Sequence, residues 1–209
     1  MNYILKHFDI ALMKFRINSD VIEGLSIEII EIDEKQRSLF PLDLKLTDRG
    51  LLKWLKRRVI PKNRAFVQSF LAKLKLNIND TKGIIDICKG LSLNDCYWVV
   101  DDDFSGTFAK YNLYDNRFSR ILSLIAYTGF GETKESGFAS TPELTTGGML
   151  AKCWRRINRQ IILYKAGSSG AANTGNEPYS EFYAFQVARA MELNAIEYNL
   201  HKWKMIYKM

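Results

Sequence analysis

Short stretches near the N-terminus alternate between apolar and polar positions, as half-buried β-strands do. "YILKHF" and "LSIEIIEI" both mix branched aliphatic residues with polar ones, and this mixture favours strands over helices. "NSD" and "DEKQ" supply turn residues before and after the second stretch. The pattern therefore predicts strands from Tyr3 to about Ile32, followed by a break at Pro41.

The period of the apolar positions becomes helical after Thr47. Apolar residues then recur on one helix face, at Leu51, Leu52, Leu55 and Val59. "NRAFVQSFLAKLKL" predicts a second amphipathic helix after Pro61. In "NDTKGIIDICKGLSLNDCYWVV", Asn and Asp precede short apolar runs as helix caps do, which predicts a compact helical cluster. "DDDFSGTFAKYNLYDN" has the composition of a loop, and "RFSRILSLIAYTGF" predicts a helix that ends near Gly129.

The last third of the chain predicts a hairpin and one further helix. "GFGETKESGFASTPE" is rich in Gly, Ser and Thr, and we place a subdomain boundary in it. "MLAKCWRR" and "RQIILYKA" predict two strands joined by a basic turn at "INR", and "SEFYAFQVARAMEL" predicts a helix that starts near Asn176 and Pro178. The predicted fold class is α+β, with a small β subdomain at 1–45, a helical subdomain at 46–130, and an antiparallel sheet with one helix at 131–209.

Composition limits the partners of the chain. Its 209 residues suffice for one large domain or two small ones. The apolar runs are too short to span a bilayer, and Lys6, His7 and Asp9 interrupt the N-terminus as they would not in a secretory signal. We therefore expect a cytoplasmic protein with no membrane partner. The net charge of +7 favours an anionic partner, whether a nucleotide, a nucleic acid or an acidic protein.

Cysteine and histidine are too scattered to suggest a metal site or a hydrolytic triad. The three cysteines form no CxxC pair, which suits a reducing compartment. The only two histidines, His7 and His201, lie near opposite ends of the chain. A zinc site of Cys/His type and a Ser-His-Asp triad are therefore both disfavoured.

Two adjacent glycines precede the predicted hairpin. Gly147 and Gly148 stand just before the first strand, where the lack of a Cβ lets backbone amides come close to a ligand. Amides arranged in this way favour phosphate oxygens. A Gly-Gly pair is also typical of an ordinary loop bend, so the pair alone does not establish a phosphate site.

A lysine on the second strand and a glutamate on the last helix share an unusual placement. With a period of two, Lys165 lies on the same strand face as Ile161 and Leu163. Glu181 shares a small, apolar helix face with Ala184, Phe185 and Ala188, and we expect this face to pack on a sheet. A buried lysine and a buried glutamate reduce each other's desolvation cost, which predicts an ion pair. Alternatively, Lys165 extends outward into solvent and Glu181 serves the helix N-terminus, a role that suits Glu177 better.

A glycine turn, a strand lysine and a helix glutamate follow one another in this order in protein kinases. There the loop covers the phosphates, the lysine contacts them and the glutamate fixes the lysine. In this part of the chain the sequence resembles the HipA-like Ser/Thr kinases, which include toxins of bacterial toxin–antitoxin modules and shorter phage- or mobile-element-borne relatives. The resemblance covers most of the chain and is strongest from Ser140 to about Trp203.

The resemblance assigns roles to individual residues. The family's loop reads roughly Ser-x-x-Gly-x-x-x-Lys, and Thr145, Gly148 and Lys152 stand at those places. The family's phosphate-holding lysine falls on Lys165 and its paired acid on Glu181, while "SLFPLDLKL" resembles part of the family's small first subdomain. The resemblance thus implies a kinase-like N-lobe at 131–209, with Thr145 as a candidate autophosphorylation position. It implies that ATP is held by Gly147, Gly148, Lys152, Lys165 and Glu181.

The chain also departs from the family pattern. Ser180 stands where the family has an asparagine, directly before the helix glutamate Glu181. Glu192 stands where the family has a glycine that ends the helix. We therefore expect Asn194 to form the helix C-cap in its place. In kinases the catalytic and metal-holding aspartates come from a second lobe, whereas this chain ends at "HKWKMIYKM". We therefore expect weak ATP binding without phosphotransfer by this chain alone, and Mg²⁺ only if a second lobe is supplied. "DDDFSG" precedes the glycines and is interpreted as a solvated turn.

Two classes of function remain open beside the kinase-like one. The resemblance implies a separate C-lobe or an antitoxin-like DNA-binding protein as partner. The stretch "KWLKRRVIPKNR", from Lys53 to Arg64, has six basic residues and no acid. This is typical of a regulatory module that binds nucleic acid, but a solvated helix face is the interpretation we favour. A pure interaction subunit that docks a catalytic lobe would instead carry a large apolar patch.

Overall fold

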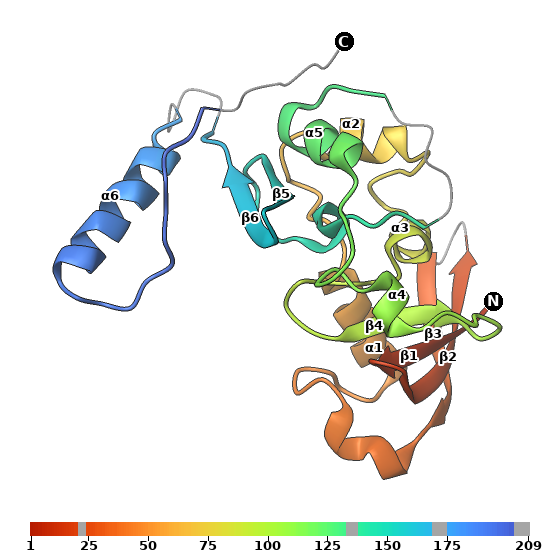
Figure 1. Cartoon of the computed structure of the whole chain (residues 1–209). Coiled ribbons are helices and arrows are strands. Elements are labelled where there is room, and N and C mark those ends of the chain that lie inside the picture. The colour runs from red at the N-terminus through yellow and green to blue at the C-terminus, as the bar shows by residue number, and fades with distance from the viewer. Residues whose placement is uncertain (21–23, 133–137, 169–174, 203–209) are drawn as a thin grey trace. The chain divides into compact units, whose positions relative to one another are not determined.

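The chain folds into two compact units, each of which is described by itself. The computed structural model describes residues 1–20, 24–132, 138–168 and 175–202. One unit comprises Met1–Tyr164 and the other Lys165–Met209. Helices alternate with two antiparallel sheets, one of four strands and one of two (Figure 1). The predicted α+β fold class is therefore confirmed.

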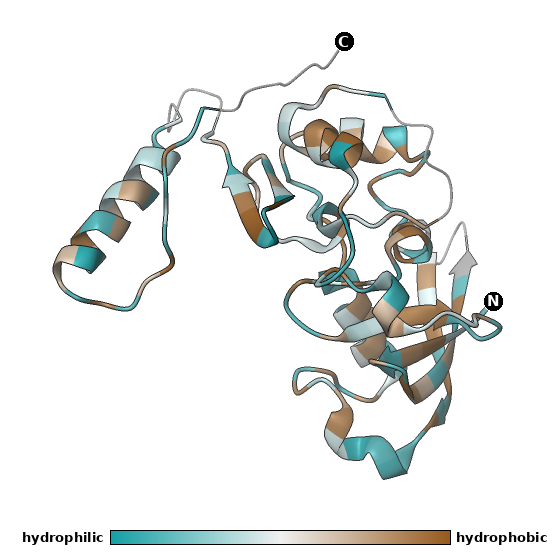
Figure 2. Ribbon diagram, viewed as in Figure 1, coloured by the Kyte–Doolittle hydropathy of each residue, from teal (hydrophilic) through white to brown (hydrophobic). Residues whose placement is uncertain are grey.

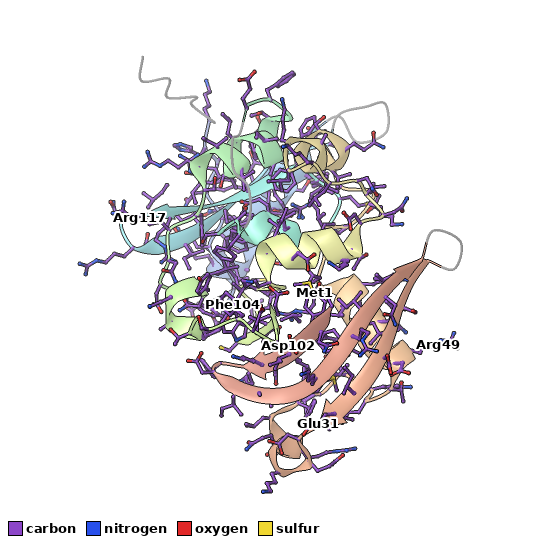
Figure 3. The ribbon with its side chains drawn as sticks, turned by 90° about the vertical axis from the view of Figure 1, so that its right-hand side faces the viewer. Met1, Glu31, Arg49, Asp102, Phe104 and Arg117 are labelled. Atoms are coloured by element: carbon purple, nitrogen blue, oxygen red, sulfur yellow. The ribbon has the colours of Figure 1, made fainter. Side chains whose placement is uncertain are left out.

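A four-stranded sheet forms the beginning of the first unit. Its strands are β1 (Asn2–His7), β2 (Ile10–Asp20), β3 (Gly24–Ile32) and β4 (Tyr97–Asp101), in the order β3-β2-β1-β4. Figure 3 shows this sheet from the side, with Glu31 near the end of β3 and Asp102 directly after β4. The predicted strand structure from Tyr3 to about Ile32 is confirmed by β1, β2 and β3. The expected turn at "NSD" is wrong, because Asn18, Ser19 and Asp20 belong to β2.

The fourth strand corrects the sequence prediction, which placed its residues in a helical cluster. β4 pairs antiparallel with β1, with Leu5 opposite Val99. Trp98, Val99 and Val100 are all buried, so both faces of this strand are covered. A strand covered on both faces carries an unbroken apolar run, which periodicity cannot distinguish from a buried helix.

Helix α1 (Asp48–Arg57) covers the sheet and completes its core. It starts as predicted, since the side chain of Thr47 accepts a hydrogen bond of 3.1 Å from the amide of Gly50. A short 3₁₀ helix, η1 (Glu34–Leu39), precedes it. The shared core contains large apolar side chains from the strands and from α1, among them Leu5, Phe15, Leu51, Trp54 and Leu55.

The predicted helical cluster forms a second core in the same unit. It contains α2 (Val67–Lys73), α3 (Thr81–Cys88) and α5 (Arg120–Thr128). α3 is capped by Asp80 and α5 by Ser119, and α5 ends at Gly129 with a φ of 78°, as its sequence predicted. The short helix α4 (Phe108–Tyr111) lies in the stretch that was expected to be a loop. Its Phe108 packs with Trp98 in a third core that joins α4 to β4.

The observed division of the chain differs from the predicted parts at 1–45, 46–130 and 131–209. β4 comes from the predicted helical part and completes the N-terminal sheet, so these two parts belong to one unit. Residues 133–137, within the predicted second boundary, lie outside the described residues. Beyond them, Ala139 and Leu144 pack in the same core as Leu122. The first unit therefore continues through this segment to Tyr164.

The predicted hairpin is present and is the last part of the first unit. A 3₁₀ helix, η2 (Pro142–Thr145), leads to β5 (Lys152–Ile157) and β6 (Gln160–Lys165). Asn158 and Arg159 form the two-residue turn with φ values of 48° and 69°. Two consecutive positive φ values are typical of a type I′ turn, whose twist matches that of the two strands.

The second unit contains the predicted helix α6 (Glu177–Ala190). Its C-terminus corrects one expectation, because Glu192 itself adopts the left-handed conformation, with a φ of 56°, and Asn194 does not replace it. The amide of Leu193 donates to the carbonyl of Ala188 at 2.9 Å, and the amide of Glu192 donates to Arg189 at 3.1 Å. These two bonds form a Schellman motif, in which glycine usually takes the place of Glu192. In the parts of the chain described, every helix is too short or too polar to traverse a bilayer.

The strained end of α6 gives a direct test of this helix terminus. Replacing Glu192 by glycine (Glu192→Gly) removes the steric cost of a φ of 56°. We expect exchange of the α6 amides with solvent to slow by about fivefold, equivalent to about 1 kcal/mol. Met191→Gly is the control, because Met191 has a φ of −87° and no such strain to relieve. Faster exchange in Glu192→Gly would contradict the assigned terminus.

Candidate functional site

The carbonyl groups of the glycine loop, Thr146–Met149, are bound by the interior of the first unit. Arg64 donates to the carbonyls of Thr146 at 2.6 Å, Gly147 at 3.1 Å and Gly148 at 3.2 Å. The amide of Ala65 donates to the carbonyl of Met149 at 2.7 Å. Every carbonyl of the loop therefore has an internal donor.

The amides of the same loop have the opposite environment. Gly147, Gly148 and Met149 are exposed, and among the described residues no group accepts a hydrogen bond from their backbone N–H groups. Gly148 has a φ of 90°, which reverses the direction of the backbone at this point. A short turn that binds its carbonyls internally and leaves successive amides exposed is suited to an anion.

Lys152 supports the loop from within. The side chain is buried, and its ammonium group donates to the carbonyl of Gly147 at 2.9 Å. A Cβ atom at Gly148 would collide with this ammonium group. The resemblance implies that Lys152 contacts ATP, whereas the structure places its amine against the backbone of the loop. We therefore assign it the positioning of the loop.

Arg64 is a site residue that the sequence did not identify. Only 3% of its surface is exposed, and burial lowers its pKa to about 10, although the carboxylate of Glu143 opposes this shift. Glu143 is itself fully buried, and burial raises its pKa. It accepts hydrogen bonds from the amide of Trp154 at 2.7 Å and from the hydroxyl of Thr141. The loop thus rests on a buried cation and a buried acid.

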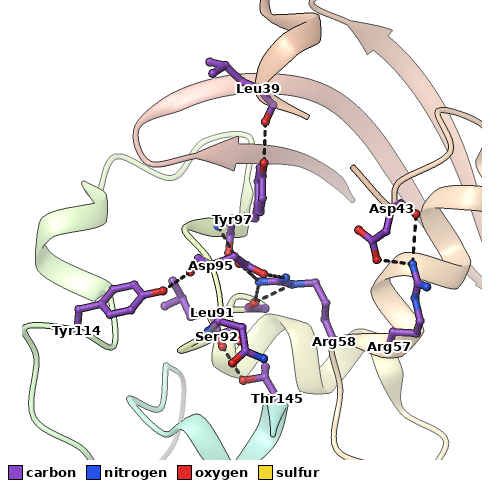
Figure 4. A network of polar contacts seen from close by, with 12 residues as sticks. Leu39, Asp43, Arg57, Arg58, Leu91, Ser92, Asp95, Tyr97, Tyr114 and Thr145 are labelled. Carbon is purple, nitrogen blue, oxygen red and sulfur yellow. Dashed lines mark hydrogen bonds and ion pairs between the residues drawn. The ribbon is translucent and has the colours of Figure 1, made fainter. Parts of the chain in front are cut away.

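Thr145, the candidate autophosphorylation position, ends η2 and has its hydroxyl group in a hydrogen bond. Its Oγ1 donates to the carbonyl of Leu91 at 2.7 Å (Figure 4). The residue is half-buried. A phosphoryl group on this oxygen would replace the donor of that bond, so modification requires η2 to separate from Leu91.

Most of the cations in the basic stretch Lys53–Arg64 are bound by oxygen atoms of the protein itself. Arg58 is buried and donates to the carboxylate of Asp95 at 2.6 Å and to the carbonyl of Gly90 at 2.7 Å. Arg57 pairs with Asp43 at 2.8 Å on the surface (Figure 4). Arg64 and Lys62, which donates to the side chain of Asn79 at 2.6 Å, bring the number of cations bound by the protein's own oxygens to four of six, which leaves less charge for a nucleic acid.

The predicted pair of Lys165 and Glu181 is present within the second unit. The ammonium group of Lys165 forms an ion pair with the carboxylate of Glu181. The side chains are 24% and 32% exposed, so the pair is half-buried but open to solvent. The Lys165 amine also lies 5.6 Å from the ring centroid of Tyr198. The alternative in which Lys165 extends outward without a partner is therefore excluded.

Glu177 lies in the first turn of α6 and binds the chain that precedes the helix. Its carboxylate accepts a hydrogen bond of 2.9 Å from the amide of Ser168. Hydrogen bonding from Ser168 holds the pKa of Glu177 below its usual value. Asn176 starts the helix as predicted, but its side chain makes no capping bond. Glu181 is thus available for Lys165.

The apolar face of α6 lines a groove next to this ion pair. Its residues Ala184, Phe185 and Ala188 form one wall, and the groove has a volume of about 360 Å³. The facing wall comes from the segment after the helix and consists of Ala195, Ile196 and Tyr198. We expected this helix face to pack on a sheet. Within the unit it faces the segment that follows the helix.

The predicted site residues therefore fall into two groups. Gly147, Gly148 and Lys152 lie together in the first unit, and Lys165 and Glu181 lie together in the second. Among the described residues, no cluster of three or more His, Cys, Asp or Glu side chains is arranged to hold a metal ion.

The stretch "DDDFSG" is a turn after β4, as predicted. Asp102 pairs with Lys14 at 2.8 Å on the surface, and both Asp102 and Phe104 are labelled in Figure 3.

Comparison of the chain with models of protein families, with curated proteins and with solved structures gives no match.

The two glycines of the loop are expected to respond differently to substitution. Gly148→Ala places a Cβ against the Lys152 ammonium at a φ of 90°, and we expect it to lower the free energy of unfolding by about 1–2 kcal/mol. Gly147→Ala is the matched control, because a Cβ there has no atom within 4 Å. Urea unfolding followed by tryptophan fluorescence measures both, and equal losses would contradict the described geometry.

The two ion pairs at the end of α1 provide a second comparison. Asp95→Ala leaves the buried Arg58 guanidinium without its carboxylate, and we expect a loss of about 3 kcal/mol in the free energy of unfolding. Asp43→Ala breaks the exposed pair with Arg57, where we expect a loss below about 1 kcal/mol. The same urea titration distinguishes them, and a small loss in Asp95→Ala would show that the Arg58 network does not stabilise this unit.

Proposed function

We propose that this chain is the nucleotide-binding, N-terminal portion of a HipA-like Ser/Thr protein kinase. The observation that supports the proposal most strongly is the ion pair between Lys165 and Glu181. In the kinase arrangement, a helix glutamate orients a strand lysine toward the phosphates of ATP. Here the lysine ends β6 and the glutamate lies on α6, the next element along the chain.

The chemistry of the pair suits a phosphate ligand. An ammonium group has three N–H donors, and the carboxylate of Glu181 does not use all of them. The side chain of Lys165 is 24% exposed, so an anion can approach it. Glu181 holds the ammonium group of Lys165 in place, and a phosphate oxygen then adds a second anionic partner.

The glycine loop supplies the second part of the proposal. Its exposed amides at Gly147, Gly148 and Met149 are donors for phosphate oxygens. Arg64 and Lys152 hold the loop by its carbonyls, so the donors are oriented before a ligand arrives. Preorganised donors of this kind bind an anion at a lower entropic cost than a mobile loop.

The proposal concerns nucleotide binding and leaves phosphotransfer to a second lobe. In the kinase arrangement, the catalytic base and the Mg²⁺ ligands belong to that lobe. A C-lobe is therefore what we propose to complete the nucleotide site. A nucleic-acid-binding role is less favoured, because Arg57, Arg58 and Arg64 already bind oxygens of this chain.

A fluorescent ATP analogue tests the proposal directly. We expect saturable binding, and we expect Lys165→Met to weaken it by about tenfold, equivalent to about 1.4 kcal/mol. Glu181→Gln should weaken it less, since the lysine remains but loses its orienting charge. Lys202→Met is the matched control in the same unit, because Lys202 is an exposed lysine, and it should bind as the unchanged chain does.

Two outcomes would overturn the proposal. One is the absence of saturable binding, and the other is an equal effect of Lys165→Met and Lys202→Met. Circular dichroism of each variant checks that α6 is retained, so that a loss of binding is not a loss of structure.

A further inference from the structure

The two sheets have four outer edges, and three of them carry hydrogen bonds from elsewhere in the first unit. On β3, the amide of Ile29 donates to the side chain of Asp48 at 2.8 Å. On β4, the amide of Val99 donates to the carbonyl of Lys89 at 2.8 Å. Bonds of this kind obstruct the pairing of an edge strand with another chain.

The outer edge of β5 is closed by two buried side chains. The amide of Trp154 donates to Glu143 at 2.7 Å, and its carbonyl accepts a bond of 3.0 Å from the hydroxyl of Ser123. Trp154 therefore directs its backbone groups away from β6. This direction agrees with the alternation of an antiparallel ladder that starts from the two-residue turn.

The edge of β6 differs from the other three. Ile157 and Gln160 flank the two-residue turn and form its hydrogen-bonded pair. Because hydrogen-bonded and non-hydrogen-bonded pairs alternate along an antiparallel ladder, the N–H and C=O groups of Ile161 and Leu163 point away from β5. Within the described part of the chain, no group bonds to these outward backbone groups, and the sheet ends at β6. The run Gln160–Tyr164 contains no charge, proline or glycine, and Figure 2 shows its hydrophobic character.

We propose that the free edge of β6 binds an extended, acidic segment of a partner protein by strand addition. The backbone of such a segment would bond to the outward groups of Ile161 and Leu163, as in other cases of β-augmentation. The charge of the hairpin determines the character of the partner. Residues 152–165 include no acid and five basic residues. Lys152 is buried and Lys165 is paired with Glu181, so the positive charge of the hairpin surface comes from Arg155, Arg156 and Arg159, of which Arg159 is exposed.

Charge also argues against a second copy of this chain as the occupant. Pairing of β6 with β6 of a second copy would bring together two hairpins that each contain Arg155, Arg156 and Arg159 and no acid. Like charges on neighbouring strands destabilise a strand pair. An acidic residue of a different protein would pair with Arg159, which is exposed at the turn.

This inference does not depend on nucleotide binding. It uses the backbone of β6 and the side chain of Arg159, whereas the proposed nucleotide site uses the ammonium group of Lys165. Failure of one therefore leaves the other intact, and the two are measured with different ligands.

The test uses a fluorescein-labelled peptide of eight residues in which valine and glutamate alternate. We expect its fluorescence anisotropy to rise on binding, and we expect Arg159→Asn to weaken binding about fivefold, since one opposite charge is removed. Asparagine tolerates the φ of 69° at this position, so the turn is retained. Lys53→Asn is the matched control, because Lys53 is exposed on α1, and it should leave the affinity unchanged.

Two further peptides separate strand addition from attraction by charge. The same peptide with alternate backbone amides N-methylated cannot complete the ladder, and we expect its binding to be lost. A peptide with lysine in place of glutamate should bind at least tenfold more weakly than the acidic one. In hydrogen exchange, the amides of Ile161 and Leu163 should become protected only when the acidic peptide is present.

Several results would overturn the inference. They are the absence of binding, equal binding of the N-methylated or lysine peptide, and protection of the Ile161 and Leu163 amides without peptide. Protection of this last kind would mean that the edge is already occupied by the chain itself or by a second copy, and sedimentation of the protein alone would distinguish those two cases.

Discussion

A cation beneath a protein surface must be met by oxygen atoms, and this requirement organises both units of the chain. Arg58 is met by a carboxylate and by backbone carbonyls, and it joins the end of α1 to β4. Arg64 is met by three carbonyls of the glycine loop. Lys165 is met by Glu181. An unpaired charge at the buried Arg58 or Arg64 would cost several kcal/mol, so their bonds fix the segments that supply the oxygens.

The same requirement connects the fold with the proposed function. Arg64 and Lys152 draw the carbonyls of the glycine loop inward, and the exposed amides of Gly147 and Gly148 are the consequence. Two cations bind the carbonyl groups of this loop, and its exposed backbone amides can donate hydrogen bonds to an anion. The half-buried pair of Lys165 and Glu181 is prepared in the same sense, because its lysine is charged, oriented and still open to solvent.

Local patterns in the sequence predicted the strands, the helix caps and the hairpin, since each depends on neighbouring residues. β4 was missed because both of its faces are buried and its apolar run has no period. The pair of Lys165 and Glu181 was predictable because both residues lie on apolar faces of adjacent elements. Arg64 was not, because its main partner, Thr146, is 82 residues away. Nothing near Arg64 in the sequence distinguishes it from the exposed cations of the same stretch.

The central claim is that the ammonium group of Lys165, held by Glu181, receives the phosphates of a nucleotide. The most direct measurement is the NMR signal of lysine ammonium groups in the intact chain during a titration with ATP. The account predicts that the Lys165 signal is observable before ATP is added, because its hydrogen bond to Glu181 slows exchange, and that it shifts in a saturable manner as ATP binds. A Lys165 signal that stays unchanged while ATP binds elsewhere, or no binding of ATP at all, would contradict it.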